Sequence, residues 1–505
     1  MIGAAILFSA VMAFGFRIWP RLRQPEFGVD SWYYLNYARA ARKGPFRPVE
    51  LPQYLLDDPE QVYPPLFPRA LALLPKGLRE RFHWVISPLI DGLHAALLSG
   101  AVAAGTGSWL GAALAGGLFA TSPVGVAQST DLNVRPAANL LFTIFMWGLL
   151  IFWLQPGWIG GGIALGAGIA IFWTHKMTTQ QMTAMLLGLA GLTGSPLWIG
   201  LGVGIFAGAW AVHPAGFRKL MRGHREIVAF WRTHRPFLNA HPLYDSPLYR
   251  DPAKKRELAG VQGIRSARWS RFLAVGHLIV IAGLLAGMMT GRLPQSGIHP
   301  DTGAGADQPF FLAWSGLVFL TAAATQWIPG CRWFGEGFKY LRYGLFPWFL
   351  LLGTWAGTAA QTAGNFLPAW ICLGLAAAQT AVSLQAIRGQ KWNRMAVVDP
   401  EIRLIFEKIQ ERPEKRWLCL PVTRSEALAH FTDKAVLWGA HGTGWDRLAP
   451  FFPVFRKPVE DFLRTYRING LLLDRRYAAI EDLRLPAGTV ERLFQSGPHE
   501  AWRVL

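Results

Sequence analysis

Apolar segments about twenty residues long recur along most of this 505-residue sequence. Hydrophobic residues make up 52% of the chain and charged residues only 16%, whereas a typical soluble domain has about 25% charged residues. The 23 tryptophans suit a protein with many membrane–water interfaces, where indole rings prefer to lie. The pattern argues against an ordinary soluble globular fold and predicts a polytopic α-helical membrane protein.

We expect about eleven transmembrane helices within residues 1–388, which form the first domain. The segment 2–19 is interpreted as a retained helix, because no basic residue precedes it and no small-residue cleavage site follows it. The other expected spans are residues 84–104, 108–127, 137–155, 158–173, 180–195, 196–213, 272–290, 309–328, 343–360 and 364–387. The short segments 180–195 and 196–213 could also form one broken helix.

Two polar loops interrupt these segments. In the first, residues 20–82, the stretches Asp30–Arg42 and Leu66–Leu74 have apolar residues spaced as in amphipathic helices that lie on a membrane. The second, residues 214–270, is long and basic. Residues 389–505 contain more charges and lack long apolar runs, which indicates a soluble domain.

Within this C-terminal domain, short apolar runs alternate with helical patterns. The expected buried strands are Trp417–Val422, Ala435–Trp438 and Gly470–Leu473, and the expected helices are Ser425–His430 and Val459–Tyr466. Such alternation predicts a small α/β fold.

The formal net charge of +19 does not by itself identify a partner. In a soluble protein it would favour nucleic-acid binding, but here basic residues flank membrane segments and face anionic lipid head groups, so no nucleic-acid partner is expected. A basic surface could also hold a lipid-linked phosphate. The three cysteines, Cys331, Cys372 and Cys419, have no CxxC spacing, which argues against a disulfide framework and a thiolate zinc site.

An inside N-terminus would gather the polar loops on one side of the membrane. With about eleven spans, loop 20–82, the turns 128–136 and 174–179, loop 214–270 and the C-terminal domain all face outward. The basic character of loop 214–270 opposes this orientation, but the positive-inside rule weakens for loops near about 60 residues. We therefore expect an integral protein of the inner cell membrane, with these loops and the C-terminal domain on the outer, periplasmic side.

Four groups of polar residues would then meet at the outer face: Asp30, Asp57-Asp58-Pro59-Glu60, Asp131 with Arg135, and His175-Lys176. A carboxylate could deprotonate an acceptor group. Cations, or a divalent metal ion held by carboxylates, could stabilise a departing phosphate. An apolar groove between helices would hold a lipid tail. These residue types favour group transfer from a phosphate leaving group.

Each group also has a purely structural interpretation. Asp30 and Asp131 could cap helices, and Asp57-Asp58 could form a solvated turn. His175-Lys176 could anchor at the membrane interface, and Arg135 could pair with Asp131.

Inside the second expected span, Asp91 and His94 lie one helical turn apart. They could form a proton relay or a hydrogen-bonded pair facing the helical bundle.

The order of several short motifs resembles the GT-C superfamily of polyprenyl-phosphate-dependent glycosyltransferases. This superfamily includes protein O-mannosyltransferases, aminoarabinose transferases and oligosaccharyltransferase catalytic subunits. The motifs are Gly28-Val29-Asp30-Ser31-Trp32-Tyr33-Tyr34, Tyr63-Pro64-Pro65-Leu66-Phe67 and Asp131-Leu132-Asn133-Val134-Arg135-Pro136. Trp173-Thr174-His175-Lys176 looks like the Thr-Lys position of the family. The resemblance covers residues 1–213 well and is loose beyond them.

The resemblance implies a GT-C-like fold and a role for each matching residue. Asp30 would be the catalytic base or position the acceptor, Asp131 would contribute to metal or substrate binding, and Lys176 would lie near the donor phosphate. The expected substrate-binding residues are Tyr63, Asp131, Arg135, His175 and Lys176, and the expected ligands of a divalent cation (Mg²⁺ or Mn²⁺) are Asp57, Asp58 and Asp131. The donor would be a polyprenyl-phosphate sugar, and the acceptor a lipid, a glycan or a protein.

Two departures from the family pattern disfavour N-glycosylation of protein. Loop 291–307 contains Asp301 and Asp307 but no clear counterpart of the acidic sequon-binding motif of oligosaccharyltransferases. Gly444-Trp445-Asp446 has one Trp where the oligosaccharyltransferase motif has two in a row.

Two functions without transferase activity compete with this interpretation. A polytopic transporter or lipid flippase should show internal repeats and mid-membrane charges. No convincing repeat relates residues 1–213 to residues 272–387, and the acidic residues, Asp91 excepted, cluster in loops and not in the middle of the spans. In a non-catalytic assembly protein, Asp30 and Lys176 would be dispensable.

Overall fold

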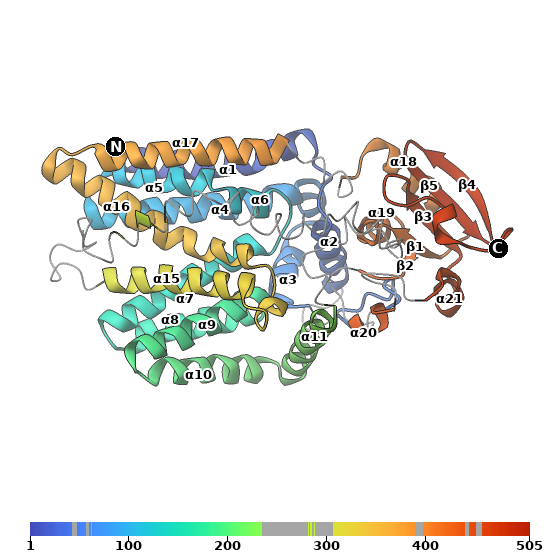
Figure 1. Cartoon of the computed structure of the whole chain (residues 1–505), viewed down its shortest axis with the longest axis horizontal. Coiled ribbons are helices and arrows are strands. Elements are labelled where there is room, and N and C mark those ends of the chain that lie inside the picture. Colours follow the sequence, from blue (N-terminus) through green and yellow to red (C-terminus); the bar gives the residue numbers. More distant parts are fainter. Residues whose placement is uncertain are drawn as a thin grey trace. The chain divides into compact units, whose positions relative to one another are not determined.

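The computed structural model describes residues 1–42, 48–56, 60–61, 63–234, 307–388, 397–439, 444–450 and 457–505, with isolated positions between 281 and 287. The predicted span 272–290 lies largely outside the described residues, as do Asp57, Asp58 and Asp301. The described chain is mostly helical and has a small C-terminal sheet (Figure 1).

The chain divides into two compact units. The helical unit contains Met1–Arg23, Trp84–Pro214 and Arg268–Gly389. The mixed unit contains Gln24–His83, Ala215–Ala267 and Gln390–Leu505, so the first polar loop and part of the second group with the C-terminal segment.

The helical unit is built from long helices that run alongside one another (Figure 1). Its elements are α1 (Ile2–Arg23), most of α4 (Lys76–Thr106), α5 (Trp109–Thr121), α6 (Pro123–Ser129), α7 (Arg135–Leu154), α8 (Trp158–Phe172), α9 (Lys176–Thr193), α10 (Leu197–Val212), α15 (Gln308–Trp327), the 3-10 segments η2 (Arg332–Phe334) and η3 (Gly337–Gly344), α16 (Leu345–Ala363) and α17 (Leu367–Arg388).

Five described helices are long and apolar enough to cross a membrane: α1, α4, α7, α15 and Leu367–Gln385 within α17. The number rises to seven if two bent pairs, α5 with α6 and α10 with α11 (Pro214–Thr233), each count as one span. The helix α8 is apolar but shorter. These helices confirm the predicted polytopic helical class. Segments 180–195 and 196–213 fall on two helices, α9 and α10, and the chain turns between them at Gly194, where φ is +65°.

Helices α5 and α16 approach so closely that their glycine backbones touch. A Cβ atom on Gly353 would lie 2.6 Å from the Ala115 Cβ and 2.7 Å from the Gly111 carbonyl oxygen. A Cβ on Gly111 would lie 2.5 Å from the Gly353 carbonyl oxygen. Small residues of this kind allow membrane helices to approach closely and to pack by van der Waals contact. This contact matters because, inside a bilayer, the hydrophobic effect does not drive helices together.

Replacing Gly353 by valine is therefore expected to force α5 and α16 apart and to destabilise the helical unit by about 1–3 kcal/mol. The matched control is Gly374→Val on α17, where an added Cβ meets nothing within 4 Å. The stability of both variants is measured by thermal unfolding in detergent, monitored by tryptophan fluorescence. Equal melting temperatures for the two variants would contradict the close packing.

The mixed unit contains a five-stranded sheet with the strand order β2-β1-β3-β5-β4. The strands are β1 (Arg416–Leu420), β2 (Ala435–Val436), β3 (Gly470–Asp474), β4 (Val490–Ser496) and β5 (His499–Val504). Strand β1 pairs in parallel with β2 and β3, whereas β5 pairs antiparallel with β3 and β4. The three expected strands thus form the parallel part, and the β4–β5 hairpin adds an antiparallel edge.

The helical elements of the mixed unit are mostly short. They are α2 (Asp30–Ala41), α3 (Leu66–Leu73), the described part of α11 that follows Pro214, α18 (Pro400–Gln410), η5 (Val422–Arg424), α19 (Ser425–Phe431), α20 (Trp445–Leu448), α21 (Val459–Thr465) and η6 (Glu481–Leu483). The predicted helices Ser425–His430 and Val459–Tyr466 coincide with α19 and α21.

Helix α2 differs from the two-faced membrane-surface helix expected at this position. Trp32, Tyr33, Tyr34, Leu35 and Tyr37 are all buried, so apolar burial extends around the helix instead of along one face. The physical reason is that α2 packs against both α3 and α19 of its own unit.

A buried histidine links α19 to α2. The His430 Nε2 lies 3.2 Å from a side-chain nitrogen of Arg39, and because arginine can only donate, this Nε2 is the acceptor. The Nδ1–H of His430 donates to the Asn36 side-chain oxygen at 3.0 Å. The Trp32 ring lies against the imidazole, with 5.0 Å between ring centroids. Burial, reinforced by the positive charge of Arg39, lowers the pKa of His430 well below its usual range. The imidazole is therefore neutral in the folded unit.

Candidate functional site

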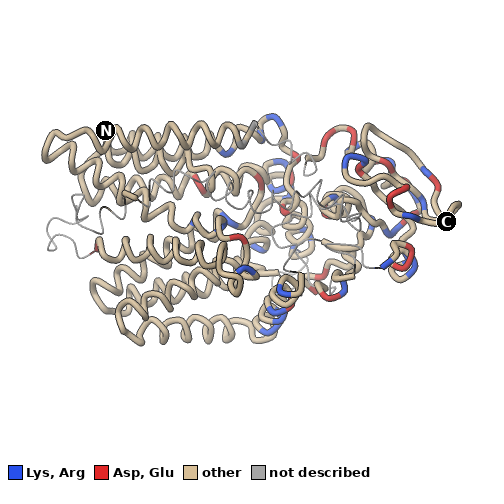
Figure 2. The backbone as a smooth tube through the Cα atoms, in the orientation of Figure 1, with Lys and Arg blue, Asp and Glu red and all other residues tan. Residues whose placement is uncertain are grey.

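Charged residues of the helical unit lie mainly toward one end of its helices (Figure 2). Arg21 lies at the end of α1, Asp131 precedes α7, and Arg135 is the first residue of α7. His175 lies between α8 and α9, and Lys176 begins α9. The sequence-predicted residues of the helical unit are therefore gathered at one end of the bundle.

Hydrogen bonds connect His175 to the segment before α16. The His175 Nδ1 lies 2.9 Å from the Thr178 hydroxyl, which in turn lies 2.7 Å from the Tyr343 hydroxyl. His175 is the residue preceding α9 and has an extended backbone, which directs its ring back over the first turn of that helix. Its neighbour Lys176 is half-buried.

Arg342, in η3 beside Tyr343, lies deep in the same cluster. Its side chain is 2% exposed, and one terminal nitrogen donates to the Gln128 side-chain oxygen at 2.8 Å. Both Arg342 and Tyr343 interact electrostatically with Arg135. The Nε–H of Arg342 has no hydrogen-bond partner among the described residues. Arg342 also interacts electrostatically with the carboxylate of Asp91. Two cations and a histidine are thus grouped around η3, with one guanidinium N–H that could still receive a hydrogen-bond acceptor.

Asp131 does not occupy the N-cap position of α7. The residue that precedes α7 is Val134, which makes no side-chain cap, so the alternative in which Asp131 caps this helix is wrong. Asp131 instead interacts electrostatically with Arg21. The segment before α7 is fixed to α4 by Ser87, whose hydroxyl accepts from the Asn133 N–H at 2.9 Å.

Asp30 and Tyr63 belong to the mixed unit. Asp30 is half-buried and is the first residue of α2, one position after the N-cap Val29. A carboxylate there is favoured by the helix dipole. The Tyr63 hydroxyl lies 2.9 Å from that of Tyr34. Of the acidic turn, only Glu60 is described, and it forms an ion pair with Lys219.

Asp91 and His94 have different partners within the helical unit. The Arg17 Nε donates to an Asp91 carboxylate oxygen at 2.6 Å, and both side chains are buried. The His94 Nε2 lies 2.9 Å from the Thr143 hydroxyl. The expectation of an Asp91–His94 pair is wrong, because the nearest cation to Asp91 comes from another helix. These contacts fix α1 and α7 to α4.

Sequence reasoning missed Arg342, Tyr343, Gln128 and Thr178. The available signal was the polar run Lys339 to Tyr343 immediately before an apolar segment, which is also typical of a membrane-interface anchor. Only the spatial arrangement distinguishes the two.

Two solved structures of the oligosaccharyltransferase AglB from Archaeoglobus fulgidus have a similar fold. The one in complex with an inhibitory peptide and a dolichol-phosphate gives a TM-score of 0.53 at 11% identity, covering 94% of this chain and 69% of that chain. The one in complex with Zn and sulfate gives a TM-score of 0.59 at 11% identity, covering 94% of this chain and 68% of that chain. No family model and no curated protein matches the sequence. The expected GT-C resemblance is therefore confirmed at the level of the fold.

Proposed function

We propose that this chain is a membrane glycosyltransferase that transfers a sugar from a polyprenyl-phosphate-linked donor to an acceptor at the outer face of the membrane. The observation that carries the proposal is the buried Arg342 beside Arg135 and His175, at one end of a helical unit with an oligosaccharyltransferase-like fold. A buried guanidinium with an unused N–H, beside the half-buried Arg135, suits a phosphate better than a neutral ligand.

In this proposal the helical unit supplies the donor site. Arg342 and Arg135 neutralise the charge that develops on the phosphate as the bond to the sugar breaks. Lys176 and His175 add positive charge or hydrogen bonds at the start of α9, where the helix dipole also favours an anion. Tyr63 would contact the bound substrate. The polyprenyl chain would lie among the membrane lipids beside the apolar helices.

Asp30 is proposed as the base. It would take the proton of the acceptor nucleophile as that atom attacks the sugar carbon from the side opposite the phosphate, which inverts the configuration. A divalent cation, Mg²⁺ or Mn²⁺, held by Asp131 with Asp57 and Asp58 would supply further positive charge at the leaving phosphate.

We also propose that the chain crosses the inner cell membrane about eleven times and that its C-terminal domain faces outward. The acceptor class is a lipid, a glycan or a protein. The AglB structure contains a peptide, and the departures at 291–307 and at Gly444-Trp445-Asp446 argue against the same acceptor here.

The direct test is transfer by the purified chain reconstituted in liposomes. A polyprenyl-phosphate carrying a radiolabelled sugar is supplied with a mixture of lipid, glycan and peptide acceptors. We expect label to move into one acceptor class and free polyprenyl phosphate to accumulate in equal amount. If labelled donor moves between the leaflets while its sugar–phosphate bond stays intact, the flippase alternative is correct and the transferase is wrong.

A further inference from the structure

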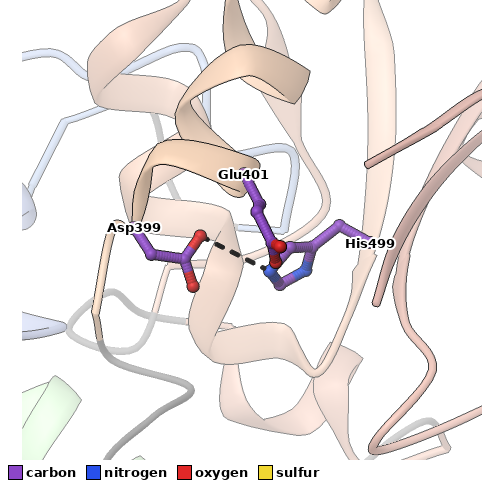
Figure 3. A group of neighbouring side chains, drawn as sticks. All are labelled: Asp399, Glu401 and His499. Atoms are coloured by element: carbon purple, nitrogen blue, oxygen red, sulfur yellow. Dashed lines mark ion pairs between the residues drawn. The ribbon is translucent and has the colours of Figure 1, made fainter. Parts of the chain in front are cut away.

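Three potential metal ligands meet in the mixed unit, outside the proposed donor site. Asp399 immediately precedes α18, Glu401 lies in its first turn, and His499 is the first residue of β5. One ligand atom from each lies within 4.8 Å of the other two. Figure 3 shows both carboxylates directed toward the imidazole ring. Residues about a hundred positions apart in the sequence are therefore placed at one point.

His499 is the unusual member of the group. Its side chain is completely buried, and neither ring nitrogen has a hydrogen-bond partner among the described residues. The Nε2 lies 3.9 Å from an Asp399 oxygen, and the Nδ1 lies 3.6 Å from an Asp474 oxygen. Both distances exceed a hydrogen bond, whereas two ligands of one cation at about 2.1 Å lie roughly 3–4 Å apart. A bound cation would satisfy a nitrogen that is otherwise buried at a cost.

The turn before β5 is shaped around the Glu401 carboxylate. Gly497 has φ +54°, and a Cβ atom there would overlap the Glu401 carboxylate group. Glycine is therefore needed at position 497 for two reasons: the backbone has a positive φ, and a Cβ atom would overlap the Glu401 carboxylate. The effect is to hold the Glu401 carboxylate against the β4–β5 turn, close to His499.

The other charged residues nearby are Asp474 and two arginines. Asp474 receives two hydrogen bonds from Arg476, at 2.6 and 2.8 Å, and lies 3.4 Å from Arg424. Three carboxylates face two guanidinium groups, so the carboxylates outnumber the guanidinium groups by one. Arg424 and Arg476 hydrogen-bond to Asp474 and also interact electrostatically with Asp399, and Arg476 does so with Glu401 as well, so the excess negative charge belongs to the group as a whole. Glu401 is exposed and Asp399 half-buried, so the group has an open side through which an ion can enter.

We propose that Asp399, Glu401 and His499 bind a divalent transition-metal cation, with Zn²⁺ as the first choice. One imidazole and two carboxylates are a ligand set that zinc accepts, and the exposed side leaves a coordination position for water. The ion would join the start of α18 to the β4–β5 hairpin. This site is independent of the proposed transferase activity and distinct from the expected ligands Asp57, Asp58 and Asp131.

The test uses the full-length chain in detergent, stripped with chelator and titrated with Zn²⁺ against a chromophoric zinc indicator. We expect one tight site per chain and a melting temperature that rises with Zn²⁺. Glu401→Gln keeps the size of an exposed side chain and is expected to weaken the tight site at least about tenfold and to abolish the thermal shift, because it removes one charged ligand. His499→Gln should do the same if it folds, but Glu401→Gln alone decides the question.

Two variants serve as matched controls. Glu407→Gln lies on the same helix, is 64% exposed and pairs only with Arg403 among the residues described, so it should bind Zn²⁺ as the wild type does. Asp131→Asn should also keep the tight site. The proposal is overturned if the wild type has no tight site, if Glu401→Gln and Glu407→Gln bind equally, or if Asp131→Asn is the variant that loses the ion.

Discussion

Replacing Asp30 by asparagine is expected to lower the sugar-transfer rate about a hundredfold to ten-thousandfold, the usual contribution of a positioned general base. Asparagine has nearly the same shape but cannot take a proton from the acceptor. Asp30 is the half-buried first residue of α2, so the neutral amide should leave the helix intact. Initial rates with a labelled polyprenyl-phosphate donor measure the effect, and circular dichroism and melting temperature check the fold.

The matched control is Asp461→Asn. Asp461 also lies in the first turn of a helix of the mixed unit, α21, but it is 42% exposed and pairs with Arg464 at 3.0 Å. We expect its transfer rate to equal that of the wild type. Turnover by Asp30→Asn within about threefold of this control would remove Asp30 from the mechanism, since a base supplies far more than that.

Replacing Arg342 by glutamine is expected to reduce kcat/KM for the donor about a hundredfold, equivalent to roughly 3 kcal/mol for losing a buried charged partner of a phosphate. Glutamine retains a hydrogen-bonding amide near Gln128 but removes the positive charge. Donor binding, measured separately by displacement of a fluorescent polyprenyl phosphate, should weaken as well. The effect should be equal for every acceptor, because Arg342 is assigned to the donor alone.

Two further variants separate charge from fold. Arg342→Lys keeps the charge but loses the planar fork of donors, and it should recover part of the activity. Arg464→Gln removes an arginine that is 76% exposed and should have no effect. Wild-type donor affinity in Arg342→Gln, with an unchanged melting temperature, would show that the cluster around η3 does not bind the phosphate.

The helical class and most helix positions are predictable from the sequence. The expected span 137–155 corresponds to α7, Arg135–Leu154, and 309–328 corresponds to α15, Gln308–Trp327. The reason is that a bilayer requires a long apolar run for each crossing, so composition alone marks the segment. Composition carries no information about which helices touch, and the contact between Gly111 and Gly353 is visible only in the structure.

The sheet of the mixed unit was predicted only where apolar runs exist. Strands β1 and β3 are buried along nearly their whole length and have continuous apolar sequences. Strand β4 is an edge strand with no residue fully buried and two adjacent exposed charges, Glu491 and Arg492, and β5 begins with buried His499 and Glu500. Glu500 is tolerated because Arg475 and Arg492 approach it at 3.8 and 3.6 Å, a compensation that no local pattern reveals.

The candidate site was predicted in part. His175 and Arg135 were singled out because they lie in short polar turns between apolar segments. Arg342 and Tyr343 follow them by more than 150 residues and precede an apolar helix, where polar residues are usually explained as interface anchors. Local sequence also paired Asp91 with His94, although its partner is Arg17, 74 positions away. Pairing across helices is a tertiary property.

The ion pair between Arg17 and Asp91 has a consequence for biogenesis. During synthesis, α1 leaves the ribosome well before α4, so its guanidinium meets the insertion machinery 74 positions ahead of the carboxylate that neutralises it. A charged side chain near the end of a membrane helix is tolerated while it reaches the lipid head groups. Burial of the Arg17 guanidinium inside the helical bundle requires the oppositely charged Asp91. Burial of Arg17 within the bundle therefore requires α4 to be present, because Asp91 of that helix supplies the neutralising charge.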